Sequence, residues 1–261
     1  TGIDIPGFIR KIATGNVRGS ATRILSANLL GYSCARVCPV EVLCVGACVY
    51  NGWHRYPPIQ IGRLQRYAVE TVFEQNGAAP LFEKAKPAGK RVACVGAGPA
   101  SLAAAGYLAI EGVEVTLFEK RKFAGGLNRT GVAPYKMHVE GAAMEVEFIR
   151  SLGVTFREGV EVGRDVTADQ LLKDFDAVFI GVGLGADSKL GIPGEDGQGV
   201  TGATAWIERM KLEPGFGAPA ASRAIVIGGG NTAIDAAREL KRLAYRDVLG
   251  STLRCCRLIK Y

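Results

Sequence analysis

The sequence lacks any apolar run of the roughly 18–20 residues that a membrane-spanning helix needs. It shows no signal peptide, and its lysines and arginines never form a continuous basic run, although the net charge is +7. No known nucleic-acid reader motif is present. These absences argue against a membrane protein, a secreted protein and a nucleic-acid-binding protein. Histidine is also scarce, and we interpret His54 and His138, the only two, as surface or packing residues.

The composition is that of a globular protein of one to two domains, with 48% hydrophobic and 22% charged residues in 261. Glycine is abundant, with 35 residues, and several glycines fall in patterned turns. Such turns favour nucleotide-binding loops over disorder. We expect the positive charge to lie on a solvated surface that attracts anionic dinucleotides.

Seven cysteines are present, and four of them fall in one segment with the spacing Cys34-x3-Cys38-Pro39-x5-Cys44-x3-Cys48. An odd, clustered set argues against a secreted disulfide framework and favours a reducing cytoplasm. Iron–sulfur clusters use cysteine ligands, often with a proline just after one of them. Zinc is the main alternative, and a set of small buried thiols is the third.

The first 76 residues indicate helices: one capped by Asp4, one over Ala21–Ser26 and one over Ile61–Gln75. The cysteine segment between the last two has no clean period, which predicts loops and short turns. Residues 77–90 have the composition of a linker.

After the linker the pattern becomes α/β. Strands are predicted over Arg91–Gly96, Glu114–Glu119, Val154–Arg157, Val160–Val162, Ala177–Gly181 and Ala224–Ile227, and helices over Pro99–Glu111, 140–152, Ala168–Phe175 and Thr232–Leu243. Two strand–glycine turn–helix units lie about 130 residues apart, as an internal repeat of the nucleotide-binding kind. Cys94 lies in the middle of the first strand, and we expect it in the core.

The first glycine turn, Gly96-Ala-Gly98-Pro99-Ala100-Ser101, follows a strand and opens a helix. The tight turn needs Gly96, and Gly98 lets the backbone approach a pyrophosphate at the helix amides. Glu119 ends the second strand, where a carboxylate binds an adenosine ribose. A carboxylate there repels a 2′-phosphate, so the turn suits FAD or NAD rather than NADP.

A family resemblance covers nearly the whole chain. Residues 3–10 (IDIPGFIR), 30–48 (LGYSCARVCPVEVLCVGAC) and 58–68 (PIQIGRLQRYA) resemble the N-terminal iron–sulfur region of dihydropyrimidine dehydrogenase, and also the glutamate synthase small subunit. The resemblance implies two [4Fe-4S] clusters in a helical domain. It implies Cys38, Cys44 and Gln65 as ligands of one cluster and Cys48 as a ligand of the other. Cys34 matches a position that is not a ligand in the dehydrogenase branch.

The same resemblance extends to the flavin. Gly125-Gly126-Leu127 resembles the second glycine motif of flavoproteins, which favours FAD over NAD at the first turn. By resemblance Lys136 lies near the flavin and Val162 offers backbone contacts to adenine. The second turn resembles the NAD(P)H loop of the family, through Gly228, Gly230, Asn231, Thr232 and Ala233.

The resemblance implies three domains: a helical iron–sulfur domain over 1–85, the first segment of an FAD domain over 86–198 and an incomplete, Rossmann-like NAD(P)H domain over 199–261. The family's other cysteines lie upstream of Ile3, so we expect this chain to hold only part of a two-cluster ligand set. Beyond Leu243 the resemblance fades into an altered or frayed terminus, where Arg254 and Arg257 are weak candidates for a 2′-phosphate and Cys255 and Cys256 have no assigned role.

The implied activity is electron input from NAD(P)H through FAD to iron–sulfur clusters, and on to a catalytic partner in a hetero-oligomer. The dehydrogenase branch, favoured by Gln65 and Ser101, reduces pyrimidines, and the synthase branch forms glutamate. No acid–base residue for either substrate can be assigned here. A truncated fragment that only binds a partner is the alternative of another class.

Overall fold

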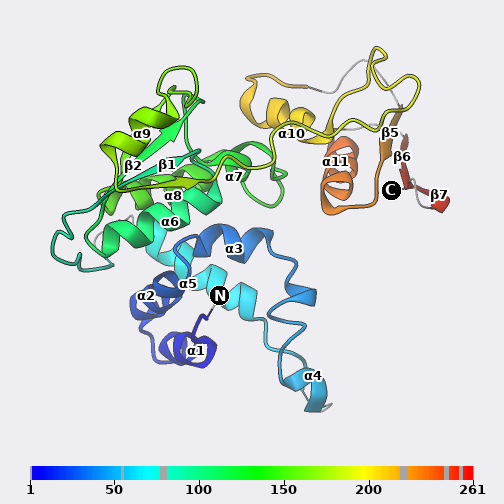
Figure 1. Cartoon of the computed structure of the whole chain (residues 1–261). Coiled ribbons are helices and arrows are strands. Elements are labelled where there is room, and N and C mark those ends of the chain that lie inside the picture. The colour runs from blue at the N-terminus through cyan, green and yellow to red at the C-terminus, as the bar shows by residue number, and fades with distance from the viewer. Residues whose placement is uncertain are drawn as a thin grey trace. The chain divides into compact units, whose positions relative to one another are not determined.

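The computed structural model describes residues 2–53, 56–76, 81–217, 223–243, 247–252 and 255–260. The chain forms two compact units: unit 1 contains Thr1–Asn128 and Glu140–Gly183, and unit 2 contains Arg129–Val139 and Leu184–Tyr261. Figure 1 shows the elements of each unit. Every helix in the described part is too short or too polar to cross a lipid bilayer. The predicted boundaries near residues 85 and 198 stay predictions.

Unit 1 begins with helices, as predicted: α1 (Ile5–Ala13), α2 (Val17–Ala27), α3 (Gly31–Val37), a 3-10 turn (Val40–Val42), α4 (Tyr50–Trp53) and α5 (Ile61–Asn76). The side chain of Asp4 accepts a hydrogen bond from Gly7 N at 2.9 Å and starts α1. Asn16 caps α2 in the same way, with Gly19 N at 2.8 Å. Local capping therefore fixes both helix starts.

The prediction of loops and turns for the whole cysteine segment was wrong at its start. Cys34 lies inside α3, and Cys38 is the residue at which that helix ends. Tyr32 explains the difference: its ring packs on Phe73 of α5, with ring centroids 5.9 Å apart, and a side chain at Gly141 would collide with it. Tertiary packing thus stabilises a short helix that the local sequence pattern does not predict.

A parallel sheet forms the rest of unit 1, with strands β1 (Arg91–Val95), β2 (Glu114–Glu119), β3 (Thr155–Glu158) and β4 (Ala177–Ile180) in the order β3-β2-β1-β4. The connecting helices are α6 (Pro99–Ile110), α8 (Val139–Ser151) and α9 (Ala168–Asp174), with the short α7 (Gly126–Thr130) before α8. Figure 1 shows α6 and α8 on the opposite side of the sheet from α9. Cys94 is fully buried in β1, as predicted.

The strand predicted at Val160–Val162 is wrong. Val160 N donates to Glu119 O at 2.9 Å, but the chain then turns, and Val162 forms only an isolated bridge with Val166. The backbone N–H groups of this segment are satisfied within the turn: Gly163 N donates to Val166 O at 2.7 Å, and Glu161 N donates to the side chain of Asp165 at 2.8 Å. A strand cannot continue past such a turn.

The N-terminal helices pack directly on α6 and α8. A Cβ on Gly106 of α6 would lie only 2.6 Å from the side chain of Leu29, so α6 and the turn after α2 approach closely there. The rings of Phe73 (α5) and Phe148 (α8) are 5.5 Å apart, and Tyr107 OH donates to Ser26 O at 3.2 Å. The helical region and the parallel sheet therefore form a single unit.

Unit 2 contains α10 (Ala203–Leu212), β5 (Arg223–Ile227), α11 (Asn231–Arg242), β6 (Asp247–Thr252) and β7 (Cys255–Lys260). Strands β5 and β6 are parallel, and β7 is antiparallel to β6. The expectation of a frayed terminus directly after Leu243 is thus wrong. Strand β6 pairs with β5, and its Val248 is fully buried in the core that α11 shares. The sequence analysis also missed α10, whose Trp206 and Ile207 fill the same core.

Candidate functional site

The first glycine turn lies at the carboxyl edge of the parallel sheet in unit 1. Gly96 N donates to Phe118 O at 2.8 Å, and Gly181 N donates to Val95 O at 2.9 Å, so the turn lies between β2 and β4. Gly96 has a φ of +85°, and a Cβ on it would lie 2.7 Å from Gly181 O. Only glycine meets both conditions, as the motif predicts.

The N-terminus of α6 is open toward this turn. Gly98 is the N-cap residue, no side chain caps the helix, and a Cβ on Gly98 would meet nothing within 4 Å. The hydroxyl of Ser101 is buried and has no hydrogen-bond partner in the described part of the chain. Free helix amides beside an open glycine fit a dinucleotide pyrophosphate, because the helix dipole favours negative charge there.

Glu119 lies next to this turn at the end of β2 and is buried. Its Oε2 accepts a hydrogen bond from Ala97 N at 2.8 Å and its Oε1 accepts one from Arg121 N at 2.9 Å. A carboxylate oxygen keeps a further lone pair after one such bond. Glu119 therefore holds the turn and retains acceptor capacity, and the ribose contact predicted for it stays a prediction.

The second glycine motif folds onto the first. Gly125 N donates to Ala97 O at 2.9 Å, and a Cβ on Gly126 would lie 2.7 Å from the Cα of Gly98. The structure thus brings together the two motifs that the sequence assigned to one flavin site. Leu127 is half-exposed. The bond from Val160 N to Glu119 O places the segment before Val162 beside the end of β2.

Unit 2 repeats the arrangement at the turn between β5 and α11. Gly228 has a φ of +138°, and its Cβ would lie 3.2 Å from that of Ala233. Gly230 is the N-cap residue of α11, again without a side-chain cap and with open space around it. Asn231 and Thr232 lie in the first turn of α11, so the five predicted residues share one uncapped helix terminus, which fits a second dinucleotide.

Lys136 lies in the segment 129–139, which belongs to unit 2 and is bonded to α11. Its Nζ lies 2.8 Å from Asp235 Oδ1, and Tyr135 OH donates to the same oxygen at 2.5 Å. Tyr135 N donates to Glu239 Oε1 at 3.1 Å. Burial and the bond to Asp235 raise the pKa of Tyr135 to about 12. The flavin contact predicted for Lys136 stays a prediction.

Replacing Asp235 by asparagine is expected to loosen the segment 129–139, because the ion pair with Lys136 is lost while the shape is kept. The expected cost is about 1–2 kcal/mol, since Lys136 is partly exposed. Hydrogen exchange followed by mass spectrometry should show faster exchange across residues 129–139. Asp187→Asn is the control, because among the described residues Asp187 accepts its backbone hydrogen bonds from the start of α10, at Thr204 N and Ala205 N. Unchanged exchange in Asp235→Asn would contradict the anchoring role.

Of the predicted cluster ligands, Cys38 lies at the end of α3 and Gln65 contacts its first residue, Gly31. The thiol of Cys38 donates to Cys34 Sγ at 3.4 Å. Burial is the main cause that raises the pKa of Cys38, to about 12, and the nearby thiols of Cys34 and Cys44 raise it further. Cys48 is buried and its Sγ accepts a hydrogen bond from Ile59 N at 3.4 Å. The buried Gln65 donates its amide to Gly31 O at 2.9 Å, so the amide oxygen is the atom that the predicted ligand role would use.

These residues do not form a complete ligand set. Within the described residues, no three His, Cys, Asp or Glu side chains converge as a metal site. A cubane needs four ligands, and the prediction assigned this chain only part of each set. The ligand roles of Cys38, Cys44, Cys48 and Gln65 stay predictions.

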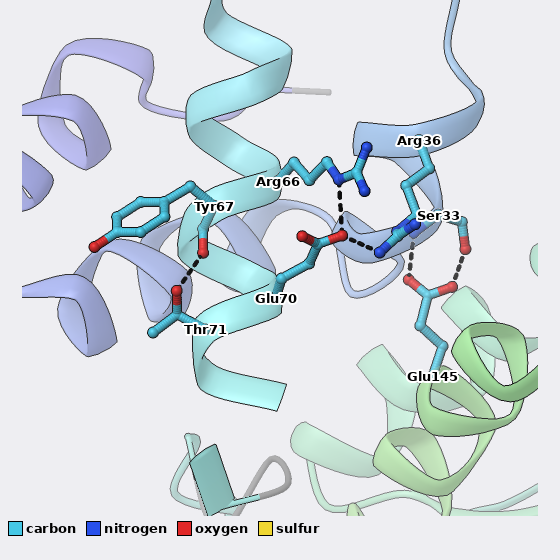
Figure 2. Close-up of polar contacts among 7 residues, drawn as sticks. All are labelled: Ser33, Arg36, Arg66, Tyr67, Glu70, Thr71 and Glu145. Atoms are coloured by element: carbon cyan, nitrogen blue, oxygen red, sulfur yellow. Dashed lines mark hydrogen bonds and ion pairs between the residues drawn. The ribbon is translucent and has the colours of Figure 1, made fainter. Parts of the chain in front are cut away.

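A buried carboxylate joins the cysteine helix to the flavin-side helix α8. Figure 2 shows Glu145 of α8 reaching the first turn of α3, where its carboxylate accepts hydrogen bonds from Ser33 N at 2.9 Å and from the Ser33 hydroxyl. The Ser33 hydroxyl also accepts a bond from Asn128 Nδ2 at 2.8 Å, two residues after Gly126. Burial raises the pKa of Glu145 to about 8, against the opposing effect of Arg36. The sequence analysis missed this residue.

Two known protein families match successive parts of the chain. Residues 1–77 match the family described as dihydropyrimidine dehydrogenase domain II, 4Fe-4S cluster, and residues 90–253 match pyridine nucleotide-disulphide oxidoreductases. The second match covers more than half of the chain. The chain belongs to the pyridine nucleotide-disulphide oxidoreductase family. The resemblance read from the sequence is confirmed, and the predicted FAD, NAD(P)H and [4Fe-4S] cofactors are those of the matched families.

Individual relatives of this oxidoreductase represent both predicted branches. The small chain of glutamate synthase [NADPH] from Escherichia coli is 35% identical over 253 residues, which are 94% of this chain and 53% of that protein. The PreT subunit of NAD-dependent dihydropyrimidine dehydrogenase from E. coli is 37% identical over 245 residues, 93% of this chain and 58% of that protein. The chain thus spans about half the length of these relatives.

Among solved structures, a mutant of FprA from Mycobacterium tuberculosis is 26% identical with a TM-score of 0.51, over 63% of this chain and 43% of that one. A 2-naphthoyl-CoA reductase structure gives a TM-score of 0.52 over 75% of this chain and 26% of its own, at 24% identity, and shows the fold alone. The Rossmann-like α/β fold predicted from the sequence is confirmed.

Proposed function

We propose that the chain is an electron-input module that takes a hydride from NAD(P)H and passes its electrons through FAD and iron–sulfur centres to a partner. One observation carries this proposal. Each unit presents a glycine turn and an uncapped helix N-terminus after a parallel strand, at Gly96–Ser101 and at Gly228–Ala233. Two such termini in one oxidoreductase fit two dinucleotides, a donor and a resident acceptor.

The residues of unit 1 account for FAD as the resident dinucleotide. The open amides of α6 bind the pyrophosphate, and Glu119 accepts hydrogen bonds from a ribose while its charge repels a 2′-phosphate. Gly125 and Gly126 close over the first turn. When bound, a flavin converts a hydride into electrons that can leave one at a time.

The iron–sulfur region receives those electrons in this proposal. The family match over residues 1–77 supports a cluster there, with Cys38, Cys44 and Gln65 as ligands of one cluster and Cys48 as a ligand of another.

The partner is proposed to be a pyrimidine-reducing dehydrogenase unit, with a glutamate-forming unit as the alternative. Gln65 and Ser101 support the first, and the similar identities to PreT and to the glutamate synthase small chain leave both open to test. Adding each kind of partner subunit to the reduced protein, with uracil or with 2-oxoglutarate and glutamine, distinguishes them by which product forms.

The visible spectrum tests the proposal itself. Protein purified without oxygen, with FAD supplied, is expected to show flavin bands, and NADH or NADPH should bleach them. Gly98→Val and Gly230→Val form a matched pair, since both N-cap positions are open and have extended backbones. The first should lose the flavin bands, and the second should keep them but lose bleaching by the nucleotide.

A colourless protein would overturn the proposal and leave a module that only binds a partner. Flavin bands that bleach equally well in Gly230→Val would place the nucleotide elsewhere. Bleaching of the wild type by dithionite but by neither nucleotide would remove the input role alone.

A further inference from the structure

The sulfur of Cys34 contacts the sulfur of Cys38, although the cluster prediction gives Cys34 no role. The two residues lie one helical turn apart, and the thiol of Cys38 donates to the sulfur of Cys34 at 3.4 Å. Both residues are partly exposed, unlike the buried Cys48 and Cys94. The pair is therefore the part of the cysteine segment in which two thiols already touch and solvent can reach them.

The local backbone allows the two sulfurs to come closer. A disulfide needs a sulfur–sulfur distance of about 2.05 Å, so the pair must close by roughly 1.4 Å. Cys34 is fixed within α3, but Cys38 is its C-cap residue, with an extended backbone (φ −63°, ψ 135°). Cys38 is thus free of the helical constraint on its side chain, and a change of rotamer can supply the movement.

We propose that Cys34 and Cys38 form a reversible disulfide when Cys38 holds no iron, and that Cys34 thereby protects Cys38 from irreversible oxidation. The 3.4 Å contact between the two sulfurs lets either residue, once oxidised, be captured by the other.

Hydrogen peroxide balances the reaction. The sulfur of one of the two residues attacks one peroxide oxygen, the O–O bond breaks, and that residue becomes a sulfenic acid with release of one water. The sulfur of the other residue then attacks the sulfenic acid, the S–O bond breaks, the S–S bond forms and a second water leaves. Two thiols are oxidised by two electrons and one peroxide is reduced to two waters. A dithiol reductant reverses the step by exchange.

Mass spectrometry of the full, iron-free chain tests the proposal. After peroxide treatment and alkylation of free thiols, trypsin cleaves at Arg36, so a disulfide links the peptide that ends there to the one that begins at Val37. Fragmentation of that product should place the link at Cys34 and Cys38, and dithiothreitol should remove it. Cys94→Ser is the matched control, because that thiol is buried in β1, and the link should persist there.

Cys34→Ser supplies the second measurement. The variant should form no link, and its Cys38 should progress to sulfinic and sulfonic acids, so that dithiothreitol after peroxide restores several-fold less alkylatable Cys38 than in the wild type. A link from Cys38 to Cys44, or equal overoxidation of Cys38 in wild type and variant, would overturn the proposal.

Discussion

Replacing Gly96 by alanine is expected to abolish FAD binding and to destabilise unit 1. The new Cβ would sit 2.7 Å from the carbonyl oxygen of Gly181, on a residue with a φ of +85°. Left-handed backbone costs about 1–2 kcal/mol outside glycine, and overpacking adds about 1–3 kcal/mol. The atoms that this Cβ would meet belong to the backbone of Gly181 and Val182, so they cannot rotate away. The β1–α6 turn must therefore move, and the amides proposed to bind the pyrophosphate move with it. The ratio of flavin to protein absorbance and the melting temperature measure the two effects.

Gly163→Ala separates the two causes. Gly163 has a φ of +99°, but a Cβ there would meet nothing within 4 Å. This variant should lose only the conformational part, about 1–2 kcal/mol, and should bind FAD at full stoichiometry. If Gly96→Ala bound as much FAD as Gly163→Ala and melted at the same temperature, the close approach of the turn to β4 would not matter for the site.

The flavin turn could be predicted from the sequence because its requirements are local. Gly96, Gly98 and the start of α6 lie within a few residues of each other, and each has a chemical reason to be there. Glu119 was found because the length of a strand–helix–strand unit fixes where the second strand ends. The structure adds what spacing cannot supply, namely that Gly126 packs on Gly98.

The residues that join distant elements could not be predicted in the same way. Glu145 and Ser33 are 112 residues apart in the sequence, and nothing near either one indicates the other. The clue was an acid beside core residues, since Val146 and Ile149 of the same helix are buried. Asp235 gave a similar clue between Ala233 and Ala236. The segment 129–139 reads as part of the flavin domain, yet Tyr135 bonds to α11, and Lys211 of α10 donates to Val132 O and Met137 O.

The most pH-sensitive part of the fold is expected to be the carboxyl group of Glu145. Burial raises its pKa from 4.5 to about 8 in the folded protein. Between these values the folded chain holds a proton that the unfolded chain has released, so stability must fall as the pH rises through this window. The slope is about 1.4 kcal/mol per pH unit, and the total is up to about 5 kcal/mol. Neighbouring Arg36 is already paired with Glu70.

Glu145→Gln is expected to keep the fold and to remove this pH dependence. The amide oxygen can still accept from Ser33 N, and the amide nitrogen can donate to the Ser33 hydroxyl. Glu145→Ala should instead lose about 3–5 kcal/mol relative to wild type at about pH 5, because it leaves buried donors at the start of α3 unpaired and opens a cavity. This deficit should shrink as the pH rises, because the variant has no acid at this position to titrate. Melting temperatures of the cofactor-free chain, taken from about pH 5 to pH 8, give the comparison.

Glu147→Gln is the matched control on the same helix. Glu147 is mostly exposed and pairs with Arg150 at 3.2 Å, so its loss should change neither the melting temperature nor its pH dependence appreciably. The decisive quantity is the difference between wild type and Glu145→Gln, since every other titrating group is common to both. A wild type that loses no more stability than Glu145→Gln across this range would mean that Glu145 stays ionised. The carboxylate would then hold α3 on α8 as a charged cap supported by Arg36, and α3 would be anchored by an ion rather than by a neutral acid.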